Sequence, residues 1–180
     1  MPTRTQMVYS QGEAWCSPTS MSMVMSYWAK RTGKGSLNQW PTNVARSVRD
    51  YSCGWGNWPF NTAYAASRGL NARVSRLGQI EQVEPWIRRG IPVVASVSWD
   101  NRNSRYRLSG APLTWSDGHI LVIRGFTKSG DVIVNDPAAQ SSSKVRRVYN
   151  RGQFERAWLR NGADRYGNYG TSDIVYFIQR

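Results

Sequence analysis

Two β-rich runs separated by five residues constrain this chain more strongly than any other feature of its sequence. Residues 118–125 and 131–137 are rich in Val and Ile, and the segment between them, 126–130, carries turn-forming Ser and Gly. The pattern predicts an antiparallel hairpin. If the chain reverses near Lys128, residues whose numbers sum to about 255 to 257 lie opposite each other.

This register predicts a pair of side chains with catalytic potential. His119, the only histidine of the chain, begins the first strand, and Asp136 lies near the end of the second. A carboxylate beside an imidazole holds the ring in one tautomer and stabilises the imidazolium. Asn135 is an alternative partner, although alternation along a strand lets only one of the two neighbours reach the ring. Asp117 is a third, less favoured partner.

Helices are expected mainly in the first half of the chain and strands mainly in the second. Residues 17–31 predict an amphipathic helix, in which Ser17 is suited to the cap and Pro18 to the first position. Further helices are predicted at 42–50, 61–68, 79–89 and 153–160, and further strands at 70–77, 91–99, 145–149 and 173–178. Residues 100–117 are too irregular for a routine connection and are a candidate binding loop. The pattern predicts a single α+β domain over residues 1–180, with N-terminal helices packed against a C-terminal antiparallel sheet.

The charge of the chain narrows its possible partners. The net charge is +13, and the cations comprise 20 Arg and 4 Lys. They are scattered, without a basic block or an RNA-binding signature, so nucleic acid is an unlikely partner. The charge favours anionic wall polymers, membrane surfaces or acidic substrates. No apolar run reaches the ~20 residues of a membrane span, and two Cys with one His predict neither a disulfide framework, nor a metal site, nor a cofactor.

Cys16 is the candidate nucleophile. It immediately precedes the predicted helix, and a helix N-terminus lowers the pKa of a thiol, as a neighbouring imidazolium does. A nucleophile on an N-terminal helix, followed by a His and its orienting residue on later strands, is the order found in papain-like enzymes. The residues alone leave open that Cys16 is a buried free cysteine. Cys53 lies in a Gly-rich loop with no following helix, and we expect it to be a bystander.

Five motifs in order carry a resemblance to a known family: WCSPTS at 15–20, GNWPFNTA at 56–63, GIPVVAS at 90–96, GHILVIRG at 118–125 and VNDPA at 134–138. Together they resemble the papain-fold cysteine peptidases related to the double-glycine leader peptidases of bacteriocin exporters, and most closely the stand-alone branch. Many relatives have Cys-Gly-Pro where this chain has Cys-Ser-Pro, and Ser preserves the capping ability.

The resemblance implies roles for individual residues. Cys16 is expected to be the nucleophile, His119 its base and then the acid for the leaving amine, and Asp136 the residue that orients His119. The family's oxyanion-hole glutamine precedes the cysteine, and we favour Gln6 over its rival Gln11.

The sequence thus predicts a thiol hydrolase that cleaves peptide or amide bonds through an acyl-enzyme. A transglutaminase-like acyl transferase with the same triad, or a non-catalytic module that binds a wall polymer, are the alternatives. The leader-peptidase role belongs to domains fused to transmembrane exporter segments, which this sequence lacks, so the substrate does not follow from the resemblance. The chain shows no signal peptide, and we expect a monomeric, extracellular mature domain, with the cytoplasm as the other location.

Overall fold

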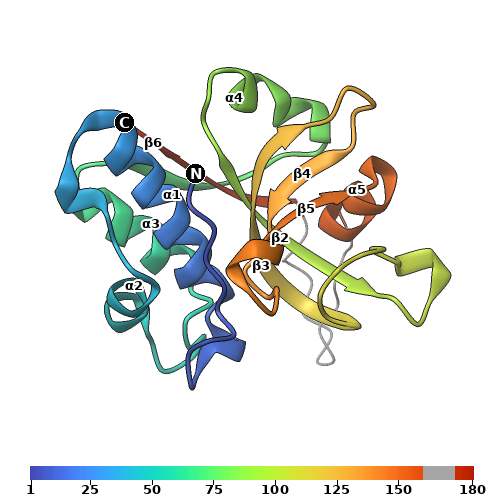
Figure 1. Cartoon of the computed structure of the whole chain (residues 1–180), viewed down its shortest axis with the longest axis horizontal. Coiled ribbons are helices and arrows are strands. Elements are labelled where there is room, and N and C mark those ends of the chain that lie inside the picture. Colours follow the sequence, from blue (N-terminus) through green and yellow to red (C-terminus); the bar gives the residue numbers. More distant parts are fainter. Residues whose placement is uncertain (160–172) are drawn as a thin grey trace.

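A six-stranded antiparallel sheet runs through the centre of the protein (Figure 1). The computed structural model describes residues 1–159 and 173–180, and within them the strand order is β1-β6-β2-β3-β4-β5. The strands are β1 (Asn71–Arg76), β2 (Val93–Asp100), β3 (Trp115–Phe126), β4 (Val132–Asn135), β5 (Arg146–Tyr149) and β6 (Ile174–Gln179). The helices are α1 (Cys16–Thr32), α2 (Pro41–Val48), α3 (Trp58–Ser67), α4 (Glu84–Arg88) and α5 (Arg151–Leu159).

The sheet has a separate hydrophobic core on each face. Helices α1, α2 and α3 cover one face and α5 the other (Figure 1). Alternation along β3 serves both cores, because Ile120 and Val122 pack with the α1 side whereas Leu121 and Ile123 pack with the α5 side. Burial on both faces explains why the central strands read as continuous apolar runs. The predicted α+β class, with helices against an antiparallel sheet, is confirmed.

Helix α1 begins one residue earlier than the sequence pattern indicates. Trp15 occupies the cap position without a side-chain capping bond, and Cys16 is the first helical residue. The hydroxyl of Ser17 lies 3.2 Å from that of Tyr176 on β6, so the expected capping role of Ser17 is wrong. The helix ends where Gly33 adopts a left-handed conformation with φ of 70°.

The predicted hairpin is confirmed as β3 and β4. The observed pairs Val122–Asn135 and Ile123–Val134 fall within the expected register, and a bulge follows at the next residue of β3. The paired region ends at Val122, so His119 is not the backbone partner of Asp136 and pairs instead with Val97 of β2.

Other boundaries differ from the predictions for local reasons. The helix expected over 79–89 is split into a 3-10 turn and α4, which begins at Glu84; the next residue, Pro85, has no N–H to continue the preceding turn. Helix α3 starts three residues early because the Asn57 side chain accepts a hydrogen bond from the Phe60 N–H at 3.0 Å. The predicted end of the last helix, at Arg160, lies outside the described residues.

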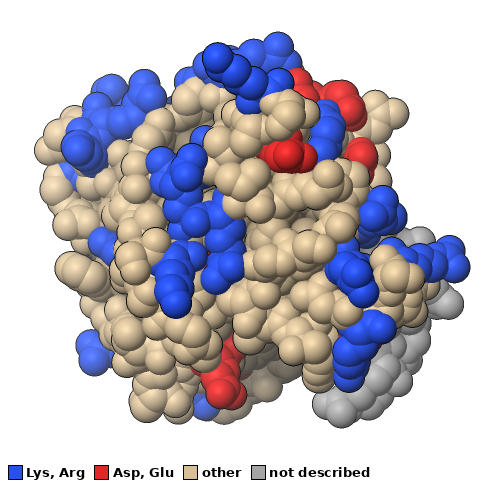
Figure 2. Space-filling view, turned by 45° about the vertical axis from the view of Figure 1, so that its right-hand side comes forward, with Lys and Arg blue, Asp and Glu red and all other residues tan. Residues whose placement is uncertain are grey.

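The surface carries positive charge in several separate groups. Figure 2 shows Lys and Arg side chains in several places across one face, with acidic side chains confined to fewer places. Within the described part of the chain, no three His, Cys, Asp or Glu side chains come close enough together to hold a metal ion. No helix in residues 1–159 and 173–180 has the length and apolar character needed to cross a membrane.

Candidate active site

The thiol of Cys16 lies where the first turn of α1 meets the sheet. Cys16 is partly exposed and forms no disulfide, and its side chain hydrogen-bonds with His119. Burial by itself raises the pKa of the Cys16 thiol, but the hydrogen bond and charge of His119, together with backbone groups of Ile120 and Ser17, lower it below its ordinary value. The thiolate is therefore stabilised by the fold.

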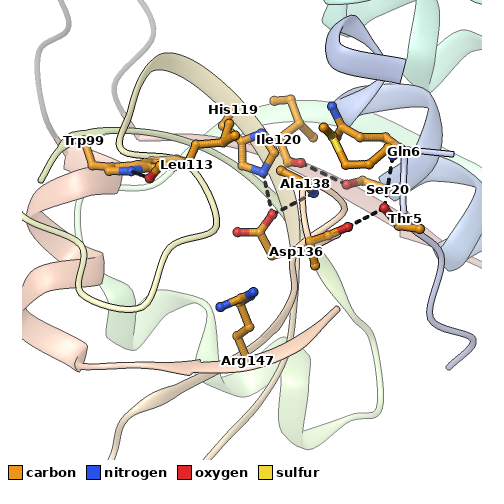
Figure 3. A network of polar contacts seen from close by, with 12 residues as sticks. Thr5, Gln6, Ser20, Trp99, Leu113, His119, Ile120, Asp136, Ala138 and Arg147 are labelled. Carbon is orange, nitrogen blue, oxygen red and sulfur yellow. Dashed lines mark hydrogen bonds and ion pairs between the residues drawn. The ribbon is translucent and has the colours of Figure 1, made fainter. Parts of the chain in front are cut away.

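His119 stands between the thiol and a carboxylate. Its side chain is 3% exposed, and its Nε2 lies 2.8 Å from Oδ1 of Asp136. Figure 3 shows the imidazole pointing towards this carboxylate. Because Nε2 is engaged there, Nδ1 is the ring nitrogen left for Cys16. The ring of Trp99 meets the imidazole edge-on, with centroids 5.5 Å apart, and Trp99 is itself held by a 3.0 Å bond from its Nε1 to the Leu113 carbonyl.

The electrostatics of this ring favour the imidazolium. Burial alone lowers the pKa of His119, but the charge and hydrogen bond of Asp136, with a smaller contribution from Cys16, raise it to about 10. The lowered pKa of Cys16 and the raised pKa of His119 have one common consequence. Both shifts favour the ion pair of a thiolate and an imidazolium, the form in which a cysteine is nucleophilic.

The Asp136 carboxylate is fully buried, and three donors satisfy it. Oδ1 accepts from His119 and from the Ala138 N–H at 3.0 Å, and Oδ2 accepts from the Tyr149 hydroxyl at 2.7 Å. Burial raises the pKa of Asp136, but His119, Tyr149 and Ala138 together bring it below its usual value. Sequence reasoning missed Tyr149; its position in the strand after the hairpin was the one signal available.

The alternative partners do not reach the imidazole. Asn135 donates from Nδ2 to the Pro2 carbonyl at 3.0 Å, and its Oδ1 accepts from Arg124 at 3.2 Å. Asp117 is exposed. The second cysteine, Cys53, is also exposed, in the loop between α2 and α3.

Gln6 joins the segment before Cys16 to the segment that holds Asp136. Its backbone N–H donates to the Pro137 carbonyl at 2.8 Å, and its Nε2 donates to the carbonyls of Gly12 at 2.7 Å and Glu13 at 3.1 Å. Its Oε1 is buried without a partner, whereas Gln11 is exposed. An oxyanion role for Gln6 requires Nε2 to release one of these two carbonyls, and this role stays a prediction.

The segment expected as a binding loop is shorter than predicted and tied down. Strand β2 reaches Asp100 and β3 begins at Trp115, which leaves residues 101–114 between them. Ser109 donates its N–H to Oε1 of Gln153 at 2.7 Å, and Arg147 donates to the Gly110 carbonyl at 2.5 Å. Because its Leu113 carbonyl also holds Trp99, this segment supports the imidazole through that tryptophan, and its role in binding a ligand stays a prediction.

A helix that begins with a cysteine, packed on an antiparallel sheet that brings a histidine and an aspartate to it, defines a protein of the papain-like cysteine peptidase fold. The profile of the Peptidase_C39 like family matches residues 1–166, and the chain belongs to this family.

Solved structures share the fold at low sequence identity. A C39-like peptidase from Bacillus anthracis is 15% identical with a TM-score of 0.63, covering 99% of this chain and 94% of the other. A double glycine motif protease from an AMS/PCAT transporter, in complex with the leader peptide, is 19% identical with a TM-score of 0.57, covering 99% and 90%. The peptidase domain of Streptococcus ComA is 14% identical with a TM-score of 0.57, covering 93% and 92%. A search of curated proteins gave no match.

Proposed function

We propose that this protein is a thiol hydrolase that cleaves peptide or amide bonds with Cys16, His119 and Asp136. The observation that carries the proposal is the position of His119, whose ring bridges the thiol of a partly exposed cysteine and a buried carboxylate. Membership of a cysteine peptidase family supports the same reaction class.

The proposed reaction follows the chemistry of an acyl-enzyme. The Cys16 thiolate attacks the substrate carbonyl, and a C–S bond forms as the carbonyl π electrons move to oxygen. The His119 imidazolium gives its proton to the leaving amine as the C–N bond breaks. Neutral His119 then takes a proton from water as the water oxygen attacks the thioester; the C–S bond breaks, the acid leaves, and the Cys16 thiolate and the His119 imidazolium are restored. The Cys16 backbone N–H and Gln6 are the proposed oxyanion donors.

The proposed substrate is a peptide. One structural neighbour was solved in complex with a leader peptide, which supports this substrate class here. The net charge of +13 favours acidic peptides or peptides attached to an anionic wall polymer. We propose an extracellular location, where such polymers occur.

Alkylation by iodoacetamide across pH tests the nucleophile without knowledge of the substrate. We expect Cys16 to react as a thiolate well below the ordinary pKa of a cysteine, and this reactivity to disappear in Cys16→Ala and to move to alkaline pH in His119→Ala. Cys53→Ala is the matched control and leaves the low-pH reaction intact. If Cys16 titrates like a free thiol, whether or not His119 is present, the proposal is wrong.

A second experiment, analysis of the reaction products, distinguishes a hydrolase from the two alternative functions. With a peptide library and an added primary amine, a hydrolase releases the free acid, whereas an acyl transferase yields the amine conjugate. Binding to a wall polymer without any reactive thiol would instead support the non-catalytic module.

A further inference from the structure

A tyrosine hydroxyl completes the chain of hydrogen bonds behind His119. Tyr149, the last residue of β5, is fully buried, and its Oη donates to Oδ2 of Asp136 at 2.7 Å. The ring of Tyr149 stacks on that of Phe154 in α5, with centroids 6.4 Å apart. The hydroxyl is therefore aimed by packing on the core of the α5 side.

The two oxygens of the Asp136 carboxylate are held from different parts of the fold. Oδ1 meets His119 on β3 and the Ala138 N–H of the following turn, whereas Oδ2 meets Tyr149 on β5. A carboxylate anchored through one oxygen can still rotate about its Cβ–Cγ bond. Anchoring at both oxygens fixes the direction in which Oδ1 faces the imidazole.

The hydroxyl also modifies the charge that Asp136 presents to the imidazole. Burial, and then the Asp136 charge, raise the pKa of Tyr149 far above its usual value, so the phenol stays protonated and acts as a donor. Its positive end offsets part of the carboxylate charge, whereas the charge of Arg147 on β5 acts on Tyr149 itself and lowers the pKa of the phenol by less than burial and Asp136 raise it. The other titratable groups that face this chain are Cys16 on α1 and Tyr176 on β6.

We infer that Tyr149 is a positioning residue of the active site, whose hydroxyl orients the Asp136 carboxylate and limits how strongly that carboxylate holds the proton on His119. The inference deepens the proposed function and rests on it. An imidazolium held too tightly is a poor acid for the leaving amine, so the hydroxyl keeps His119 acidic enough to complete the reaction.

Nitrogen NMR of the full chain labelled with ¹⁵N-histidine tests this inference directly. His119 is the only histidine, so the spectrum reports this ring alone and needs no assignment. The variant is Tyr149→Phe, which removes the hydroxyl and keeps the ring. The matched control is Tyr64→Phe, which removes another buried hydroxyl, one that donates to Oε1 of Gln39 at 2.8 Å on the opposite side of the sheet.

We expect Tyr149→Phe to raise the proton affinity of His119 roughly three- to tenfold, as part of one hydrogen bond to a charged group is lost. On a peptide substrate, kcat falls by a similar factor while KM is unchanged, because ground-state contacts are intact. Tyr64→Phe leaves both quantities at the wild-type value. An unchanged His119 titration in Tyr149→Phe overturns the inference.

A second replacement covers the case in which Tyr149→Phe does not fold. Site-specific 3-fluorotyrosine at position 149 preserves size and gives a more acidic, stronger donor, so the proton affinity of His119 shifts in the opposite direction. If it does not shift, the inference is wrong. Failure of the proposed function looks different: the wild-type protein cleaves no peptide, while the His119 titration still responds to position 149.

Discussion

At the scale of single residues, one imidazole ring links the thiol of Cys16 to a buried carboxylate. The Asp136 carboxylate raises the pKa of His119 to about 10, and His119 in turn lowers the pKa of Cys16. Removal of the carboxylate should therefore also change the pKa of the Cys16 thiol, although the two groups belong to different elements.

The variant Asp136→Asn tests this effect of the carboxylate on the thiol. We expect the pKa of His119 to fall and the thiolate of Cys16 to form only at higher pH, with kcat/KM at neutral pH lowered roughly a hundredfold or more. The pH dependence of alkylation and of peptide cleavage measures both effects. Asp117→Asn, at an exposed carboxylate, is the control and should match the wild-type protein. A wild-type pH profile in Asp136→Asn would contradict this assignment.

The same pair predicts how stability changes with pH. The pKa of His119 is raised in the folded state, so its contribution to the free energy of unfolding is fully present below the unfolded value near 6.5 and is lost as pH rises towards 10. In the wild-type protein the lowered pKa of Cys16 acts in the opposite sense, because the unfolded thiol holds its proton more tightly than the folded thiol does. Denaturant unfolding of Cys16→Ala between these pH values should therefore show the loss that His119 contributes. The slope should be smaller in the double variant Cys16→Ala/His119→Ala, and an equal slope in the two variants would refute the linkage.

At the scale of elements, the site depends on how the segment before α1 is held against the turn after β4. Gln6 reaches both, and Gly12 packs directly on it. A Cβ atom added to Gly12 would lie 1.8 Å from the backbone oxygen of Gln6, which no backbone tolerates without moving. The glycine is thus required by close approach of two segments and not by a turn conformation.

Gly12→Ala should displace Gln6 and the start of α1. We expect a loss of about 1–3 kcal/mol in the free energy of unfolding, typical of overpacking. We also expect kcat/KM for peptide cleavage to fall by a larger fraction of its wild-type value than the free energy of unfolding does. The control is Gly35→Ala, which also changes the first residue of a 3-10 turn but where an added Cβ meets nothing within 4 Å. Equal stability and activity of the two variants would show that the close contact is unimportant.

At the scale of the whole molecule, the cations have more than one role. Many arginines lie over aromatic rings, including Arg4 over Trp40 at 4.5 Å and Arg89 over Trp86 at 4.3 Å. This stacking uses the planar guanidinium and accounts for part of the excess of Arg over Lys. It does not neutralise charge, so the net +13 still attracts anions.

The attraction predicts a salt-dependent rate. For an acidic peptide substrate, kcat/KM should fall severalfold between ~0.05 M and ~0.5 M NaCl, because screening shortens the range of the field. A neutral peptide with the same cleavage site is the control and should change little. The same salt response for both peptides would remove the basis for proposing an acidic substrate.

Local patterns by themselves determined much of this protein. The hairpin, the helix predicted over 17–31, and the candidate pair His119 and Asp136 follow from apolar periodicity and turn residues, which act over a few neighbouring positions. The ordered motifs predicted the family that the comparison then showed. Boundaries were less accurate where a single side chain decides them, as at Asn57 and Pro85.

Only the tertiary structure decided which distant groups support the site. Tyr149 reaches Asp136 from the neighbouring strand, Leu113 holds the tryptophan that covers His119, and Gln6 is buried with its amide nitrogen already engaged. These contacts depend on strand pairing, on a bulge and on close packing between segments far apart in sequence. No local pattern encodes them, because each arises from the positions of atoms that the whole fold brings together.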